Sequence, residues 1–513
     1  MLVKTFGSAV YGVDAVTITA EISVENGLNY FLVGLPDSAV KESQFRIETA
    51  IKHIGYQMPR RKIVINLAPA DIRKEGSSYD LTIAVGILTA TEQISNPEEV
   101  EKYIIMGELS LDGSLQPVKG ALPIAIQARK EKFKGIILPK QNAREAAIVS
   151  NLEVYGVENL KEVIDFLNGD LMIPRTEVDT RAEFAENQQK LEFDFADVKG
   201  QENIKRALEI AAAGGHNLIL IGPPGAGKTM LAKRLPTILP PLSLNEALET
   251  TKILSVAGKL AKNISLVYQR PFRSPHHTVS DVALVGGGSN PQPGEISLAH
   301  NGVLFLDELP EFKRTVLEVM RQPMEERKVT ISRSRLSVTY PASFMLVASM
   351  NPCPCGYFNH PEKECVCGPG VVQKYLNRIS GPLLDRIDLH VEVTPVAFKE
   401  LSDSRKAEAS EIIRERVIKA RAIQAKRFEQ SSGLYANAQM EAQRVQEICQ
   451  ISEAGKNLLS RAMQKLQLSA RAYDRILKVA RTIADLAESE EIKTEHLAEA
   501  IQFRSLDREN WAG

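Results

Sequence analysis

Apolar and polar residues alternate most regularly near the start of the chain, where residues 16–24 read VTITAEISV. A period of two residues is typical of a strand with one buried face. Residues 63–67 (IVINL) predict a second, buried strand, and the segments around Asp112-Gly113 predict a hairpin with a type I′ turn. Helical patterns follow three positions: Asp37, Ser78 and Gly120. We therefore expect residues 1–170 to form an α+β domain of their own.

The pattern changes twice after this first domain. Residues 171–192, almost all polar or charged from Pro174 onward, predict a linker. From residue 193 to 400, short apolar runs alternate with helical segments, which predicts an α/β domain with a parallel sheet. Residues 401–513 are rich in Ala, Glu, Arg, Lys and Gln, a composition that predicts a helical domain.

Length and charge narrow the class of protein. The 513 residues are enough for roughly two to four domains, and 44% of them are hydrophobic and 25% charged. With 63 Lys and Arg against 64 Asp and Glu the net charge is −1, so a site for a polyanion must come from a local cluster. No apolar run approaches a membrane span, and no signal peptide is visible. We expect a cytoplasmic protein without a membrane partner.

A phosphate-binding loop follows the apolar strand NLILI and precedes a helix. Its eight residues match G-x-x-x-x-G-K-[S/T] in the strand–loop–helix setting that this motif requires. Backbone N–H groups of such a loop surround phosphate oxygens, while Lys228 neutralises them and Thr229 holds Mg²⁺. The loop residues are Gly222, Pro223, Pro224, Gly225, Ala226, Gly227, Lys228 and Thr229. The predicted ligands are ATP and Mg²⁺.

Two carboxylates end the next apolar strand, residues 303–306 (VLFL). Ligands of parallel sheets bind at the carboxyl ends of the strands. We expect Asp307 to hold Mg²⁺ and Glu308 to polarise the attacking water, which implies hydrolysis. Asn351 follows a further apolar strand and either orients that water from the opposite side or is a turn residue before Pro352.

These motifs together resemble the AAA+ ATPases, and more narrowly their magnesium-chelatase and MCM branch, in which Asn351 corresponds to sensor 1. The long stretch between Lys228 and Asp307 leaves room for an insertion with its tip at residues 286–291. Residues 328–341 (KVTISRSRLSVTYP) alternate like a β-hairpin. The resemblance implies that both segments are pore elements of a ring.

The resemblance is most specific to the ComM (YifB) family and extends over essentially the whole chain. It rests on the segments FRSPHHTVSDVALVGGG, SMNPCPCG, RISGPLLDRIDLHVEV, GLPD and NLAPADIRKEGSSYDL. It implies a homo-hexameric, DNA-stimulated ATPase motor, a helicase that drives branch migration when incoming DNA recombines during natural transformation. The alternative interpretation is a chelatase-like ATPase that remodels a protein partner.

The family pattern also implies roles for arginines outside the phosphate loop. Arg386 corresponds to an arginine finger that completes the ATP site of a neighbouring subunit, and Arg378 is the competing candidate. Arg471 corresponds to sensor 2, and Arg475 lies one helical turn away.

Positive charge at the turn of the 328–341 hairpin is the predicted DNA contact. Arg333 and Arg335 flank the turn, and Lys328 lies nearer its base. Because the whole chain has no net positive charge, it must concentrate positive charge where a phosphate backbone passes. Contacts to phosphate are independent of base sequence, as a motor on branched or single-stranded DNA requires.

The segments EGSSYDLTIAVGIL and GELSLDGSLQPVKG resemble the Lon protease domain, which has an S5-like fold. The resemblance places the Lon nucleophile at Ser78, but its partner lysine corresponds to Leu122, and Lys119 lies three residues early. A Ser–Lys pair needs an amine within hydrogen-bond reach of the hydroxyl. We therefore expect a domain without proteolytic activity, in which Ser78 is a helix cap or an inert remnant.

Four of the five cysteines lie within fifteen residues and form two Cys-x-Cys pairs: Cys353, Cys355, Cys365 and Cys367. Four thiolates can enclose Zn²⁺ in a tetrahedral site, although zinc ribbons more often use Cys-x2-Cys. Reduced free thiols and a redox switch are the alternatives. A zinc site here would follow Asn351 directly and brace it, whereas Cys449 is expected to be a small core residue.

His276 and His277 stand side by side in the segment RSPHHT. Such a pair is more often structural than a ligand, so we assign it no metal role. A nucleic-acid or intersubunit contact remains an open alternative for the pair.

Overall fold

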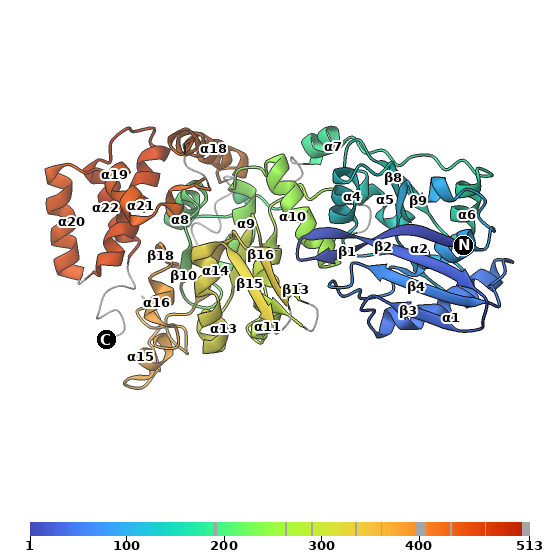
Figure 1. The fold of residues 1–513 in the computed structure, drawn as a ribbon. Helices are drawn as coiled ribbons and strands as arrows, with labels where there is room; N and C mark the ends of the chain where they lie inside the picture. Colours follow the sequence, from blue (N-terminus) through green and yellow to red (C-terminus); the bar gives the residue numbers. More distant parts are fainter. Residues whose placement is uncertain are drawn as a thin grey trace.

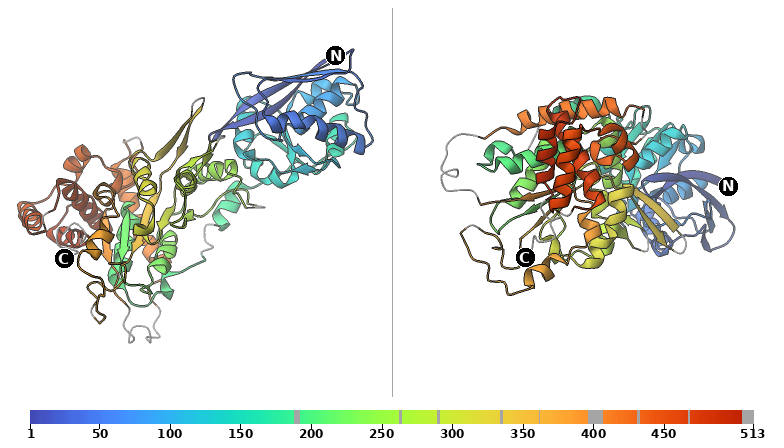
Figure 2. Two further views of the ribbon diagram at one scale, coloured as in Figure 1. Left: turned by 90° about the horizontal axis from the view of Figure 1, so that it is seen from below. Right: turned by 90° about the vertical axis from the view of Figure 1, so that its left-hand side faces the viewer.

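The computed structural model describes residues 1–187, 192–261, 264–288, 291–333, 336–360, 362–395, 407–430, 433–466 and 468–504. Its three parts follow one another along the molecule, with the N-terminal sheet at one end and the C-terminal helices at the other (Figure 1). The left view in Figure 2 shows the same order from below. In the described part of the chain, no helix has the length and hydropathy that a membrane crossing needs.

The N-terminal part is built on a seven-stranded mixed sheet in the order β3-β4-β2-β1-β5-β8-β9. The strands are β1 (Leu2–Tyr11), β2 (Asp14–Glu25), β3 (Tyr30–Val33), β4 (Lys62–Ala68), β5 (Tyr103–Ile105), β8 (Gly135–Pro139) and β9 (Glu153–Val157). The helices are α1 (Ser38–His53), α2 (Asp80–Ala90), α3 (Pro97–Val100), α4 (Ala121–Lys130), α5 (Lys140–Ala146) and α6 (Leu160–Asn168). The strands predicted at residues 16–24 and 63–67 are therefore confirmed as β2 and β4.

The predicted hairpin around Asp112-Gly113 is confirmed, but its predicted turn type is wrong. Strands β6 (Glu108–Leu109) and β7 (Leu115–Gln116) pair antiparallel and leave a five-residue loop, residues 110–114, between them. A type I′ turn needs positive φ at both central residues, and only Gly113 has it, at 84°. The Asp112 carboxylate instead accepts a hydrogen bond from the Ser114 N–H at 2.9 Å, which stabilises the wider loop.

Helices α1 and α4 begin directly after Asp37 and Gly120, as predicted. Asp37 caps α1 by accepting a hydrogen bond from the Val40 N–H at 2.8 Å. The prediction that Ser78 caps a helix is wrong, because the cap position of α2 is Tyr79 and no side chain there accepts a bond. The Ser78 carbonyl instead accepts a hydrogen bond from the Gly107 N–H at 2.9 Å.

The segment predicted as a linker contains helix α7 (Thr180–Asn187), which contacts both of its neighbours. The Glu183 carboxylate accepts hydrogen bonds from Arg144 of the N-terminal part at 2.7 Å and from Tyr268 of the following part at 2.9 Å. Phe184 packs beside them against an apolar cluster that includes Leu122 and Leu266. Helix α7 of this polar segment is therefore bound to both the N-terminal and the central part.

The central part has a five-stranded sheet in the order β11-β14-β17-β10-β18, and its neighbouring strands are all parallel. The strands are β10 (Leu218–Ile221), β11 (Phe272–Arg273), β14 (Val303–Leu306), β17 (Met345–Met350) and β18 (Leu389–Glu392). Leu218 and Leu220 pack into one core cluster and Ile219 and Ile221 into another, so both faces are covered. This arrangement confirms the predicted α/β fold.

Short elements and helices surround this sheet. Two antiparallel hairpins are present, β12 (Gly286–Gly287) with β13 (Gln292–Pro293) and β15 (Lys328–Arg333) with β16 (Leu336–Pro341). They lie where the insertion and the second hairpin were predicted. The helices are α8 (Glu202–Gly214), α9 (Lys228–Ile238), α10 (Leu244–Val256), α11 (Asp281–Val285), α12 (Glu295–Leu298), α13 (Arg314–Val319), α14 (Arg321–Glu326), α15 (Val371–Leu376) and α16 (Gly381–Leu384).

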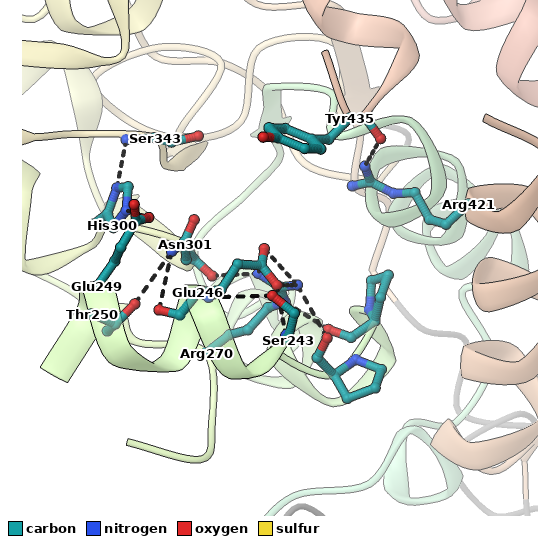
Figure 3. A network of polar contacts seen from close by, with 12 residues as sticks. Ser243, Glu246, Glu249, Thr250, Arg270, His300, Asn301, Ser343, Arg421 and Tyr435 are labelled. Atoms are coloured by element: carbon teal, nitrogen blue, oxygen red, sulfur yellow. Dashed lines mark hydrogen bonds and ion pairs between the residues drawn. The ribbon is translucent and has the colours of Figure 1, made fainter. Parts of the chain in front are cut away.

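The N-terminal part packs on helix α10 of the central part. Arg270 fixes this helix by donating to the Pro240 and Asn301 carbonyls at 2.6 and 2.7 Å and pairing with Glu246 at 3.3 Å (Figure 3). Helix α4 packs on α10 through an apolar cluster, and the Gly120 N–H donates to the Ser255 carbonyl at 3.2 Å. Both backbone and side-chain contacts thus join the two parts.

The C-terminal part is helical, as its composition predicted. Its helices are α18 (Ser410–Arg427), α19 (Ala442–Ile448), α20 (Glu453–Leu466), α21 (Ala470–Leu486) and α22 (Thr494–Gln502). It joins the central part at Asp388, which precedes β18 and is buried. The Asp388 carboxylate accepts from Arg475 of α21 at 2.9 Å and lies 3.0 Å from His216 Nδ1, which follows α8. Cys449 is 3% exposed in this core, which confirms its structural role.

Candidate functional site

The predicted phosphate loop connects the end of β10 to the start of α9. Gly225 and Gly227 have φ angles of 79° and 84°, which other residues adopt only with strain. These angles turn the loop back over the first turn of α9, where free N–H groups and the helix dipole favour an anion. The loop can therefore bind phosphate through its backbone.

Lys228 is the charged group of this loop. Its Nζ donates to the Gly222 and Pro223 carbonyls at 2.7 and 2.9 Å and to Asn351 Oδ1 at 3.1 Å. Burial lowers the pKa of the Lys228 ammonium, and the carboxylates of Asp307 and Glu308 oppose that effect. The ammonium is thus held by two carbonyls of the loop that follows β10 and by Asn351, which directly follows β17.

The Asp307 carboxylate accepts hydrogen bonds from two hydroxyl groups, one in the first turn of α9 and one near the end of β17. Thr229 Oγ1 donates to Asp307 Oδ2 at 2.8 Å, and Ser349 Oγ donates to Asp307 Oδ1. Carboxylate and hydroxyl oxygens are hard ligands of the kind that Mg²⁺ prefers, so these residues fit the predicted ion. Ser349 was not singled out from the sequence, although it lies two positions before Asn351 on the same strand.

Glu308 lies beside this group with its side chain 57% exposed. Its φ of 55° is in the left-handed region, which costs a residue with a side chain free energy and is often found at functional sites. His277 Nδ1 lies 3.5 Å from Glu308 Oε2, and the His276 and His277 rings lie 4.0 Å apart. The sequence therefore missed a contact between His277 and the predicted catalytic carboxylate.

The two candidate finger arginines differ in their surroundings. The Arg386 guanidinium bonds the Glu325 carboxylate of α14 and the Pro382 carbonyl, and the side chain is only 14% exposed. Arg378 is 54% exposed and pairs with Glu311 at 3.0 Å. Within the single chain, Arg386 is held against its own subunit while Arg378 is open to solvent.

The two candidates for sensor 2 differ in the same way. Arg471, in the first turn of α21, is 69% exposed and pairs with Asp385 at 2.6 Å. Arg475 is 23% exposed and pairs with the buried Asp388. Arg475 therefore joins the C-terminal helices to the core, and Arg471 is the arginine left accessible.

The four clustered cysteines bring their sulfur atoms together. All four lie within 4.8 Å of one another, and three pairs are at 3.3 to 3.7 Å. A tetrahedral zinc site with Zn–S bonds of about 2.3 Å has sulfurs about 3.8 Å apart, so the donor set fits Zn²⁺. Cys353 is buried and directly follows the Asn351-Pro352 segment at the end of β17.

The cysteine loop also touches the phosphate loop. A methyl group built on Gly356, next to Cys355, would lie 2.5 Å from Pro224 Cδ. Gly356 also has a φ of 86°, so both space and backbone conformation require glycine there. Glycine at this position was not singled out from the sequence.

The residues compared with the Lon base, Leu122 and Lys119, both lie toward the central part. Leu122 is fully buried in the cluster between α4 and α10. The side chain of Lys119 extends along Gly258 of the central part, where its Cε lies 2.9 Å from a built Cβ. The absence of proteolytic activity stays a prediction.

The predicted DNA-contacting residues lie on the β15–β16 hairpin. Lys328 is exposed at its base, paired in register with Pro341. Arg335 and the side chain of Arg333 lie outside the described residues. The apolar side of the hairpin packs on the core through Val329 and Tyr340.

Family models match most of the chain. The model for magnesium chelatase, subunit ChlI, covers residues 194–401, the model for subunit ChlI of Mg-chelatase covers 20–142, and that for its C-terminal region covers 407–504. Competence protein ComM of Haemophilus influenzae is 43% identical over 509 residues, 99% of this chain and 98% of the relative. The chain belongs to the ComM and YifB family of magnesium-chelatase-like AAA+ proteins.

Two further relatives match different shares of the chain. The uncharacterized protein YifB of Escherichia coli is 45% identical over 506 residues, which cover 98% of this chain and 96% of YifB. Lon protease 2 of Bacillus subtilis is 31% identical over 143 residues, 27% of this chain and 24% of the protease. As a ComM and YifB family member, the chain therefore combines a Lon-like N-terminal region with a chelatase-like AAA+ core.

Proposed function

We propose that this protein is an ATP-hydrolysing hexameric DNA motor that drives branch migration during natural transformation, and that it acts in the cytoplasm. The convergence of Lys228, Thr229, Asp307 and Asn351 at one edge of the sheet carries the ATPase part of the proposal. Lys228 and the loop N–H groups bind the phosphates, while Thr229 and Asp307 hold Mg²⁺. When bound, Mg²⁺ neutralises charge that develops on the transferred phosphoryl group.

Glu308 is the proposed base, because its carboxylate directly follows Asp307, is 57% exposed and lies 3.5 Å from His277 Nδ1. It accepts a proton from the attacking water while Asn351 orients that water from the other strand. Arg471 contacts the phosphates from the C-terminal helices, and Arg386, released from Glu325, reaches the ATP of the neighbouring subunit. Zn²⁺ on the four cysteines braces the segment that follows Asn351.

DNA is the proposed partner of the β15–β16 hairpin. The hairpin projects from the core, and its turn carries Arg333 and Arg335 with Lys328 near the base. These cations bind the phosphate backbone inside the ring and move with the ATPase cycle. The name of the Haemophilus relative, a competence protein, supports DNA over a chelatase-type protein partner.

The double variant Arg333→Ala/Arg335→Ala tests this proposal. We expect it to keep basal ATPase activity and ring assembly, to bind DNA more weakly with a smaller salt dependence, and to lose branch migration. The exposed pair Arg60→Ala/Arg61→Ala in the N-terminal part removes the same charge elsewhere and is the matched control. Unchanged DNA affinity and strand movement in the hairpin variant would contradict the proposal, and ATPase activity indifferent to DNA would favour a protein partner.

A further inference from the structure

The tip of the N-terminal β1–β2 hairpin contacts the β15–β16 hairpin of the central part. Tyr11 Oη donates a hydrogen bond to the Ser337 carbonyl at 3.0 Å, across 326 residues of sequence. A methyl group built on Gly12 would lie 3.0 Å from Val338 Cγ1, and Val13 packs against the core cluster that contains Val338. In Figure 1 the end of the β1–β2 ribbon lies next to this hairpin.

This contact lies close to the turn of the β15–β16 hairpin. Ser337 pairs in register with Ser332, and the next pair, Arg333 with Leu336, is the last before the turn. The apolar pair beneath, Ile331 and Val338, is only 7% and 3% exposed. The far end of a projecting hairpin is thus covered on its apolar face.

A second element covers the same face. A methyl group built on Gly286 of β12 would lie 2.8 Å from Ile331 Cδ1, and Tyr340 Oη donates to the Pro291 carbonyl at 2.7 Å. The hairpin therefore lies between the β12–β13 insertion and the N-terminal tip. Each of these two neighbours contributes a hydrogen bond and an apolar contact to the β15–β16 hairpin. The orientation of the hairpin therefore depends on both.

The tip is itself anchored to the ATPase core. Asp14, at the start of β2, pairs with Lys252 of α10 at 3.5 Å. The Gly120 N–H bonds the Ser255 carbonyl three residues further along α10, and the α4–α10 cluster packs beside these contacts. With the body of the domain held on α10 and its tip on β16, the N-terminal domain bridges two sites of the core.

We propose that the N-terminal domain is a brace for the β15–β16 hairpin, and that Tyr11 and Val13 are positioning residues that hold strand β16 in its orientation. This gives the Lon-like domain a role in DNA movement that needs no proteolytic group. The inference rests on the proposed function, in that the turn of the hairpin is taken to contact DNA. Removing the tip contacts leaves the arginines and the ATP site intact but lets the turn move away from the DNA path.

The full-length variant Tyr11→Phe/Val13→Ser tests the brace. Tyr11→Phe removes only the hydroxyl, and Val13→Ser removes the apolar contact. Val33→Ser, at an exposed position of β3 in the same domain, is the matched control. Strand displacement on a forked DNA, basal ATPase rate, DNA affinity and the thermal unfolding midpoint are measured for each protein.

We expect the double variant to displace strands at least about fivefold more slowly than the control. Its basal ATPase rate and unfolding midpoint should match those of the control, because a merely structural defect would lower both. If the double variant displaces strands as fast as the control, the proposed role of the N-terminal domain is wrong, but the proposed DNA motor function is unaffected. A wild-type protein that neither binds nor moves DNA overturns the proposed function and the brace together.

Discussion

Gly356 of the cysteine loop packs directly on Pro224 of the phosphate loop, with room for no more than a hydrogen atom between them. This contact joins the candidate zinc site to the candidate ATP site without a hydrogen bond. If the cysteine loop shifts toward Pro224, the phosphate loop must therefore shift with it, or the backbone at Gly356 must distort.

Gly356→Ala should weaken ATP binding by about tenfold. The new methyl group would meet Pro224 and the backbone would be strained at positive φ, which costs about 1–3 kcal/mol. Equilibrium binding of a fluorescent ATP analogue measures the effect. Gly368→Ala is the matched control in the same loop, because a methyl group built there meets no atom within 4 Å. Equal affinity in both variants would mean that Pro224 adjusts at no cost.

Lys228→Ala and Glu308→Gln should fail at different steps. Loss of the ammonium should weaken ATP binding by about tenfold or more, since charged hydrogen bonds contribute about 1.5–3 kcal/mol. Glu308→Gln should bind ATP normally and hydrolyse it about a hundredfold more slowly. Binding and single-turnover assays separate the two, with the exposed Lys233→Ala on the same helix as control. Normal turnover by Glu308→Gln would remove Glu308 from the role of base.

Zinc should copurify with the protein at about one ion per chain. The variant Cys353→Ser/Cys355→Ser should lose the metal, because two of four thiolate ligands are gone, whereas Cys449→Ala should keep it. Elemental analysis of the purified proteins decides this. A metal-free native preparation with full ATPase activity would identify the cluster as plain thiols.

Arg386 should act between subunits once its contact with Glu325 is broken. Neither Arg386→Ala nor Glu308→Gln rings should hydrolyse ATP, but rings mixed from both should recover part of the activity, because some interfaces then carry an intact finger and an intact base. Rings mixed from Arg378→Ala and Glu308→Gln give the parallel test for the competing arginine. Absence of recovery in rings proven to be mixed would exclude action in trans by Arg386.

Acid should destabilise the protein below about pH 6.5. Burial lowers the pKa of His216 and of His390, so the folded chain keeps both imidazoles neutral while the unfolded chain, with an ordinary histidine pKa, binds protons. The unfolded state then holds more protons, and stability falls by up to about 1.4 kcal/mol per pH unit for each histidine. Urea unfolding from pH 7 to 5 should show this slope, reduced in His216→Asn and unchanged in the exposed His53→Asn. A slope equal in all three proteins would contradict it.

The local order of residues was enough to predict much of the ATP site. A strand, a glycine-rich loop and a helix follow one another along the chain around Lys228, so their geometry depends on neighbours in sequence. Asp307 and Asn351 were predictable because parallel strands place their carboxyl ends at one edge, wherever the strands lie in the sequence. The β15–β16 hairpin and the helical C-terminal part were likewise local patterns, of period two and of composition respectively.

Only the tertiary structure decided which separate segments touch. The contacts of Tyr11 with Ser337, Gly356 with Pro224 and His277 with Glu308 join loops and strand ends that have no shared pattern in the sequence. Similarly, the polar residues of α7 gave no sign that Glu183 bonds residues on both sides of it. Periodicity reports which face of an element is buried, but the partner on that face depends on how whole layers pack, which involves residues far apart in the chain.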